Sequence, residues 1–311
     1  MRSRHLLLTL LAAAVLASCG SGSAFSGAAS RPSVFRYAYS VSMDDPDVAL
    51  QRVQPVKRYL EQTLRVRVEM TPTTNYGAVI EAFRAHKIDG ASISPFSYVL
   101  AAQKASIVAI VMHGGENGGP AVYTGSLGVP ATSPLHSVQD LVQHSKELTI
   151  SFVDPASASG FLVENAYLQS LGLEPQRDFR KVIFTMNHLN SILTLKAGKV
   201  DVAAVNERFM ARLIATGKLG ANDIRILWTS PTIPNQPIAV SSTLPPDFKE
   251  EIRRAFLGMA QKDPVAFAAQ VPHAFAGMSS LRAPYVRADD SMFDGLREMA
   301  RHVPNLSLLE H

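Results

Sequence analysis

The residues with the clearest chemical potential lie in one short turn, Ser151-Phe-Val-Asp-Pro-Ala-Ser-Ala-Ser-Gly-Phe-Leu162. Alternating β-branched and aromatic residues before it predict a buried strand, and the apolar spacing from Phe161 onward predicts a helix. Ser157 and Ser159 place two hydroxyls at the helix start, and Gly160 allows the backbone to approach closely. Unpaired N–H groups and the helix dipole favour an anion there. The alternative is an ordinary serine-capped helix.

Strand-like and helix-like segments alternate on both sides of this turn, which predicts an α/β fold. The predicted strands and extended segments are 35–41, 66–70, 88–93, 107–112, 122–129, 148–153, 182–186, 200–205, 224–228 and 237–241. The predicted helices are 47–64, 76–86, a short one through 98–102, 138–143, the one that starts near 161, 188–197, 247–261 and 291–302. The first of these is predicted in spite of Pro55.

An internal repeat joins two parts of the chain at a constant offset, which is the separation between Tyr76 and His188. Each copy predicts a helix followed by the matched pieces Lys87-Ile-Asp-Gly-Ala and Lys199-Val-Asp-Val-Ala. Two lobes built alike would produce this pattern, and Tyr76 and His188 would then face a shared cleft. The alternative is chance similarity between two common helix–turn–strand units.

The composition indicates a globular protein, with 311 residues, 47% hydrophobic and 18% charged. Its formal charge is +4, but Arg2 and Arg4 belong to the first segment and leave 4 − 2 = +2 for the remainder. This charge is too small for a nucleic-acid-binding protein, and basic and aromatic residues are not interleaved.

Residues 1–18 are predicted to be a targeting segment, because two arginines precede an apolar run that is too short to span a bilayer. The run ends at Leu16-Ala-Ser-Cys19, which resembles a bacterial lipoprotein signal and predicts lipidation of Cys19. Cys19 is the single cysteine, so a disulfide framework is excluded. Residues 19–33 are predicted to be a flexible tether. The alternative is a plain secretory signal.

Several motifs in one order resemble the substrate-binding lipoproteins of phosphate, phosphite and phosphonate ABC importers. They are Asn75-Tyr-Gly-Ala-Val-Ile-Glu-Ala-Phe-Arg84, Lys87-Ile-Asp89, Ser94-Pro-Phe-Ser-Tyr98, Asp154-Pro-Ala-Ser-Ala-Ser-Gly160, Gly198-Lys-Val-Asp-Val-Ala-Ala-Val-Asn206 and Ser230-Pro-Thr-Ile-Pro-Asn-Gln-Pro237. The resemblance implies a periplasmic-binding-protein-like fold of type II, with two α/β lobes joined by a two-segment hinge. The first lobe would comprise 34–125 and 238–311, and the second lobe would comprise 126–237.

The same resemblance implies a set of ligand-binding residues at matching positions. The turn would hold the phosphoryl oxygens, and the full set is Tyr76, Ser94, Tyr123, Ser157, Ala158, Ser159, His188, Asn206, Arg208 and Gln236. Ala158 stands where relatives often have Thr, so one hydroxyl is missing. The two tyrosines are alternatively half-buried core residues, and His188 is alternatively structural.

Two positions depart from the pattern of the family's aminoalkylphosphonate binders, in which two carboxylates hold the ligand's ammonium group. Arg208 and Gln236 occupy those places here, which disfavours aminoethylphosphonate because an arginine repels a cation. Arg208 either binds a second anionic group of the ligand or points to solvent. Neighbouring Glu207 is a carboxylate that could take the vacated role.

The sequence therefore predicts an extracytoplasmic, lipid-anchored binding protein that captures a phosphorus oxyanion and delivers it to an ABC permease and its ATPase. It is expected to be a monomer without cofactor, metal or nucleic acid. A sulfonate-binding protein and a sensor subunit are alternatives. A serine hydrolase is a further alternative, which the absence of Gly-x-Ser-x-Gly around Ser157 and Ser159 disfavours. The nine scattered histidines show no metal-ligand spacing.

Overall fold

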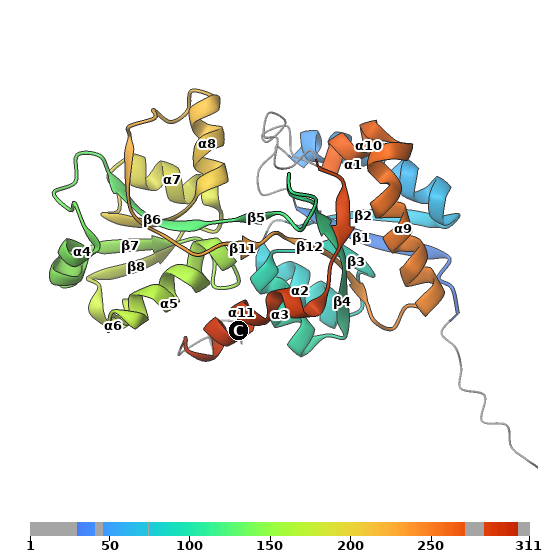
Figure 1. Ribbon diagram of the computed structural model, residues 1–311, viewed down its shortest axis with the longest axis horizontal. Coiled ribbons are helices and arrows are strands. Elements are labelled where there is room, and N and C mark those ends of the chain that lie inside the picture. The colour runs from blue at the N-terminus through green and yellow to red at the C-terminus, as the bar shows by residue number, and fades with distance from the viewer. Residues whose placement is uncertain (1–29, 41–45, 74, 271–282, 304–311) are drawn as a thin grey trace, which may run out of the picture.

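The computed structural model describes residues 30–40, 46–73, 75–270 and 283–303. The predicted signal at 1–18, the lipidation site Cys19 and most of the predicted tether lie outside these residues. Two β-sheets lie side by side, and helices cover both of them (Figure 1). We call the half built on the six-stranded sheet lobe 1 and the half built on the five-stranded sheet lobe 2.

The sheet of lobe 1 has the strand order β13-β4-β12-β3-β1-β2. Its strands are β1 Val34–Ser40, β2 Arg67–Thr73, β3 Gly90–Ser92, β4 Ile107–His113, β12 Pro237–Ser241 and β13 Tyr285–Arg287. β1 pairs in parallel with β2 and β3, whereas β12 is antiparallel to β3 and β4. The parallel strands come from consecutive β–α–β units, as the alternating sequence pattern predicts.

The sheet of lobe 2 repeats this plan in the order β10-β6-β9-β7-β8. Its strands are β6 Gly125–Pro130, β7 Thr149–Phe152, β8 Lys181–Phe184, β9 Val202–Asn206 and β10 Ile224–Thr229. β7 is parallel to β8 and β9, and β6 is antiparallel to β9. β6 and β12 occupy equivalent positions in the two sheets. Each is the first strand of its sheet after the chain passes from one lobe to the other, and each pairs antiparallel with a neighbouring strand, β9 or β3.

Two short strands connect the lobes. β5 Val122–Tyr123 pairs antiparallel with β11 Ile233–Pro234, and both lie between the two larger sheets (Figure 1). The extended segment predicted over 122–129 is thus divided between this connection and β6.

Most of the predicted helices are confirmed by the structure. They are α1 Pro46–Leu64, α2 Tyr76–Arg84, α3 Pro95–Lys104, α4 Val138–His144, α5 Val163–Ser170, α6 Pro175–Asp178, α7 His188–Lys196, α8 Glu207–Ala215, α9 Pro246–Lys262, α10 Pro264–Gln270 and α11 Asp294–Arg301. α1 continues through Pro55 as predicted. The sequence analysis missed α6, α8 and α10. Within the described residues, no helix has the length and apolar character needed to cross a bilayer.

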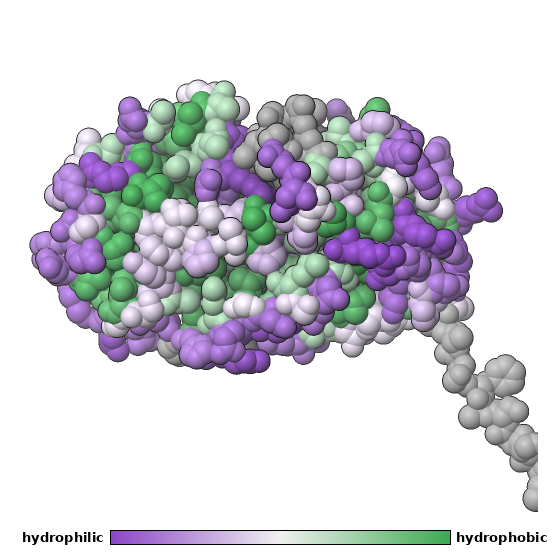
Figure 2. Space-filling view, in the orientation of Figure 1, coloured by the Kyte–Doolittle hydropathy of each residue, from purple (hydrophilic) through white to green (hydrophobic). Residues whose placement is uncertain are grey.

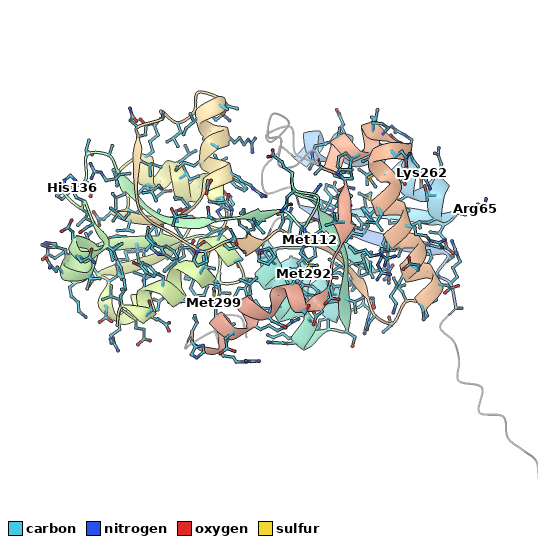
Figure 3. The ribbon with its side chains drawn as sticks, in the orientation of Figure 1. Arg65, Met112, His136, Lys262, Met292 and Met299 are labelled. Atoms are coloured by element: carbon cyan, nitrogen blue, oxygen red, sulfur yellow. The ribbon has the colours of Figure 1, made fainter. Side chains whose placement is uncertain are left out.

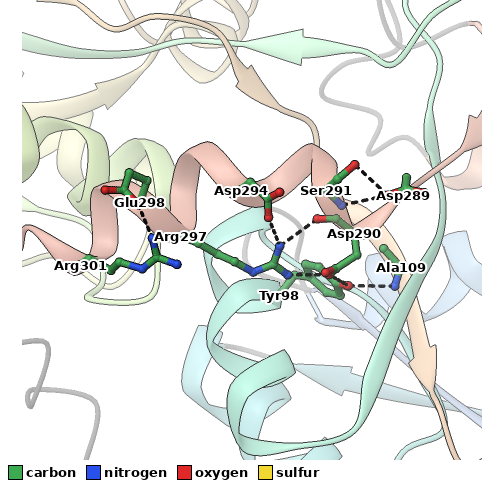
Figure 4. A network of polar contacts seen from close by, with 9 residues as sticks. All are labelled: Tyr98, Ala109, Asp289, Asp290, Ser291, Asp294, Arg297, Glu298 and Arg301. Carbon is green, nitrogen blue, oxygen red and sulfur yellow. Dashed lines mark hydrogen bonds and ion pairs between the residues drawn. The ribbon is translucent and has the colours of Figure 1, made fainter.

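The last helix lies across the two lobes on one side of the molecule. α11 contacts α3 of lobe 1 and α5 of lobe 2, and Met292 and Met299 lie along this side in Figure 3. Tyr98 of α3 donates to Asp290, which also pairs with Arg297 and fixes the start of α11 to lobe 1 (Figure 4). The face drawn in Figure 2 carries hydrophilic and hydrophobic side chains interspersed over both lobes.

The internal repeat is visible in the backbone of both lobes. Asn75 and Asn187 cap α2 and α7, and each side chain accepts the N–H three residues later, at Ala78 and Asn190. The strands that follow, β3 and β9, pair in parallel with β1 and β7 respectively. The constant offset in the sequence therefore marks two equivalent helix–turn–strand units rather than chance similarity.

Candidate functional site

The predicted anion turn joins the end of β7 to a helix start and is held by local hydrogen bonds. The Asp154 carboxylate accepts the N–H of Ala156 at 2.8 Å, and the backbone carbonyl of Asp154 accepts the N–H of Ser157 at 2.9 Å. Val153 donates its N–H to the carbonyl of Gly160 at 2.7 Å. A Cβ on Gly160 would lie 2.5 Å from the Val153 side chain, so only glycine allows this close approach.

The helix begins with a wide π turn, η2 Ala158–Leu162, before α5. Leu162 donates to the carbonyl of Ser157 at 3.1 Å, five residues earlier, and Val163 likewise donates to Ala158. Isolated π turns occur frequently at functional sites. The first N–H groups of such a helix have no partner within it, so Ala158 and Ser159 direct theirs toward the turn. Both residues are buried.

The hydroxyls of the turn are oriented by side chains from other elements. Asn206 donates Nδ2–H to Ser159 Oγ at 3.0 Å, which leaves the Ser159 O–H free to donate elsewhere. The phenol of Tyr76 interacts with Ser157, and that of Tyr123 interacts with Ser159. Burial raises the pKa of Tyr76 to about 12 and also raises the pKa of Tyr123, so both phenols stay neutral. The turn thus meets donors from lobe 1, the connection and lobe 2.

Arg208 lies against the connecting strand β5. It follows Asn206, which caps α8 and accepts the Arg208 N–H at 3.0 Å. Its guanidinium donates to the carbonyl of Val122 and lies over the ring of Tyr123, with Cζ 5.3 Å from the ring centroid. Desolvation by partial burial lowers the pKa of Arg208, which still leaves it charged at neutral pH. Exposed Glu207 instead accepts the hydroxyl of Thr124.

His188 is the first residue of α7 and is buried. Its ring packs on Phe209 of α8, with centroids 4.6 Å apart. Burial lowers the pKa of His188 to about 4, so the imidazole is neutral at physiological pH. Nδ1 has no hydrogen-bond partner among the described residues. A neutral ring keeps one N–H for donation, but no described contact joins His188 to the serine turn.

The remaining candidates are arranged less closely around the turn. Ser94 is half-buried at the start of α3, where its side chain makes no capping hydrogen bond. Ala158 lies within the turn and brings only backbone groups. Gln236 is exposed between β11 and β12, and its N–H donates to its neighbour Asn235. The structure therefore brings together two tyrosines, two serines and an asparagine, and no described contact joins Gln236 to them. The residues brought together are Tyr76, Tyr123, Ser157, Ser159 and Asn206.

Sequence reasoning missed two groups beside the turn. Ser97 of α3 donates its hydroxyl to the carbonyl of Ala156 at 2.9 Å, which joins lobe 1 to the turn. Glu164 of α5 is fully buried, and its oxygens accept no hydrogen bond from another described residue. It lies so near Gly125 that a methyl group there would overlap its carboxyl. A single charge within the apolar run 161–168 was the signal available for Glu164.

Comparisons with known proteins place the chain in one family. The model of the family described as ABC transporter, phosphonate, periplasmic substrate-binding protein matches residues 39–293. The phosphonates-binding periplasmic protein of Escherichia coli is 28% identical over 203 residues, which are 65% of this chain and 60% of that protein. The phosphate-import protein PhnD of Mycolicibacterium smegmatis is 25% identical over 213 residues, 65% of this chain and 64% of that protein. Both matches span less than two thirds of the relative.

Solved structures share the fold. A binding protein component of a phosphonate ABC transporter from Pseudomonas aeruginosa has a TM-score of 0.74 at 21% identity, covering 91% of this chain and 90% of that one. PhnD1 from Prochlorococcus marinus, in complex with methylphosphonate, has a TM-score of 0.71 at 18% identity, covering 87% and 98%. The periplasmic-binding-protein fold is therefore confirmed, and the family implies an extracytoplasmic location. With most of its length matched by the family model, the chain belongs to the periplasmic substrate-binding proteins of phosphonate ABC transporters.

Proposed function

We propose that the chain is the lipid-anchored binding component of an ABC importer and that it captures a phosphorus oxyanion between its two lobes. The observation that carries the proposal is the buried serine turn at a helix start, whose hydroxyls face donors from both lobes and from the connection. Such a turn offers backbone N–H groups, hydroxyls and the helix dipole to an anion. The relatives' names, which specify phosphonates in one case and phosphate in the other, support this ligand class.

The proposed ligand set keeps the residues expected from the sequence. The turn residues Ser157, Ala158 and Ser159 hold the phosphoryl oxygens. Two tyrosines donate their hydroxyl groups to the ligand, and two further side chains complete the binding site on lobe 2. The tyrosines are Tyr76 and Tyr123, the lobe 2 side chains are His188 and Asn206, and Ser94, Arg208 and Gln236 are assigned to the ligand's substituent. The first lobe is proposed to comprise 34–125 and 238–311 and the second 126–237, although α11 contacts both.

The remaining parts of the proposal concern mechanism and partners. Binding proceeds by closure of the lobes without covalent chemistry, so the protein is not an enzyme. The partners are the permease and ATPase of the importer, and the protein itself is a monomer. Cys19 carries the lipid, which holds the protein at the membrane. Replacement Cys19→Ser should move the protein from the membrane fraction to the soluble fraction of cells.

Calorimetry on the full chain, purified in detergent, tests the ligand class. Phosphate, phosphite, methylphosphonate, aminoethylphosphonate and sulfate are titrated at one pH. At least one phosphorus oxyanion should bind with a micromolar or lower Kd, which corresponds to a binding free energy of about −8 kcal/mol or a more negative value. Ser159→Ala should weaken that ligand about tenfold to a hundredfold, because it removes a hydrogen bond to a buried charge.

Ser170→Ala is the matched control, since its exposed hydroxyl bonds only to Tyr167 of its own helix. Binding of sulfate alone, or no loss in Ser159→Ala, would contradict the proposal.

A further inference from the structure

Arg208 is a partly buried cation beside the proposed anion site, and its guanidinium forms no ion pair with a described carboxylate, although the charge of Glu207 partly offsets the lowering of its pKa by burial. No carboxylate of the described residues lies within 4.0 Å of its guanidinium, which instead contacts the Val122 carbonyl and the Tyr123 ring. One carbonyl satisfies one of five guanidinium donors. A guanidinium in this setting binds a planar anion through two parallel N–H groups.

The ring of Tyr123 relates Arg208 to the serine turn. The phenol hydroxyl interacts with Ser159, while the face of the same ring lies under the guanidinium. Arg208 and the turn therefore contact the same tyrosine side chain. This shared contact supports a ligand whose phosphonate occupies the turn and whose short substituent meets Arg208.

The other titratable groups near Arg208 do not reverse the positive charge of this region. Glu207 is exposed, accepts the Thr124 hydroxyl and partly offsets the effect of burial on the pKa of Arg208. Burial raises the pKa of Asp154 and of Glu164, which favours their neutral forms. His113 of β4 is also neutral, because burial and the charge of Arg208 lower its pKa to about 4. An ammonium group placed here would be repelled by the positive charge of Arg208.

We infer that the ligand is a phosphonate carrying a carboxylate on a short chain, with its phosphonate on the Ser157–Ser159 turn and its carboxylate on Arg208. This inference rests on the proposed function. The carboxylate is favoured over a second phosphoryl group because its single charge matches that of one guanidinium, and its planar shape fits the remaining donor edge.

The test compares phosphonoacetate with methylphosphonate by calorimetry on the full chain in detergent. The wild-type protein should bind phosphonoacetate about tenfold to a hundredfold more tightly, as expected for a charge-assisted pair. Arg208→Gln should abolish this preference by weakening phosphonoacetate much more than methylphosphonate, and circular dichroism with urea unfolding shows whether the variant is folded. Arg208→Glu should instead favour aminoethylphosphonate over phosphonoacetate.

The matched control is Lys199→Gln, which removes one exposed positive charge from lobe 2 ahead of β9, whereas Arg208 follows that strand. It should keep the wild-type preference. Equal binding of the two phosphonates, or equal loss of both in Arg208→Gln, would overturn the inference while leaving the proposed function intact. Tighter binding of methylenediphosphonate than of phosphonoacetate would overturn the carboxylate assignment. If neither these phosphonates nor phosphate or phosphite binds, the proposed function itself fails.

Discussion

Replacing Glu164 by Gln should raise the free energy of unfolding at neutral pH. The Glu164 carboxyl is fully buried, accepts no hydrogen bond from another described residue, and has its pKa raised well above 4.5 by desolvation. The folded state therefore holds a proton that the unfolded state releases. The stability that this proton linkage contributes is fully present below about pH 4.5. It is lost as the pH rises from there through the folded-state pKa of Glu164.

The size of this effect follows from proton linkage. Each pH unit between 4.5 and the folded-state pKa of Glu164 costs about 1.4 kcal/mol. The cost at pH 7 therefore has a ceiling of about 3 kcal/mol, which is set by the interval between pH 4.5 and pH 7. Gln is nearly isosteric and does not ionise, so it removes this pH dependence without opening a cavity.

Urea unfolding at several pH values between 4.5 and 8 measures the difference. Trp228, the single tryptophan, stacks on Tyr167 of α5 at 4.0 Å between ring centroids and so reports on the lobe that holds Glu164. The increase in the free energy of unfolding caused by Glu164→Gln should be near zero at pH 4.5 and should grow with pH. Glu147→Gln removes an exposed carboxylate of lobe 2 and controls for net charge. A variant that is less stable than wild type by the same amount at every pH would refute the reasoning.

Two further substitutions test the turn itself. Gly160→Ala should lower the free energy of unfolding by about 1 to 3 kcal/mol in urea denaturation, because its methyl group would overlap Val153. Gly77→Ala, whose nearest neighbour would be 3.8 Å away, should be neutral or stabilising, and equal effects of the two would contradict the close-approach argument. Ser97→Ala removes the hydrogen bond from lobe 1 to Ala156, so in calorimetry it should weaken every ligand by the same factor, about three- to tenfold. A ligand-selective effect would show that Ser97 contacts ligand rather than the opposite lobe.

The features predicted correctly from the sequence depend on neighbours along the chain. The strand, turn and helix around Ser157 follow from local spacing, and the close approach at Gly160 is confirmed by its contact with Val153. The same is true of α2 and α7, which begin at their asparagine caps. α8 was also within reach, because Phe209, Met210 and Leu213 have helical spacing, although only Leu213 is buried.

Contacts between distant segments do not follow from local spacing. Tyr76 and Ser157 are far apart in sequence and meet because two lobes pack together, and the family resemblance alone placed them in one site. The orientation of Arg208 depends on β5, which lies far earlier in the chain. The burial of Glu164 depends on Gly125 in β6, so its unpaired carboxyl appears only when the sheet and helix are assembled.

The repeat explains why the candidate residues occur in pairs. Tyr76 and His188 begin α2 and α7. Ser94 and Asn206, which are separated by the same offset, precede α3 and α8 at the N-cap position. Each pair follows equivalent strands, and helix starts at the carboxyl ends of parallel strands are where α/β sheets bind ligands.

The serine turn has no counterpart among the described residues of lobe 1. It follows β7, whose counterpart in lobe 1 is β1, and the residues after β1 lie outside the described part of the chain. Within the described residues, the anion-binding groups are therefore concentrated on lobe 2, while lobe 1 contributes Tyr76 and Ser97, which contact the turn. Ser97 holds the turn through the Ala156 carbonyl, whereas Arg208 is proposed to bind the ligand's substituent. Losing Ser97 should therefore weaken all ligands equally, and losing Arg208 should distinguish between them.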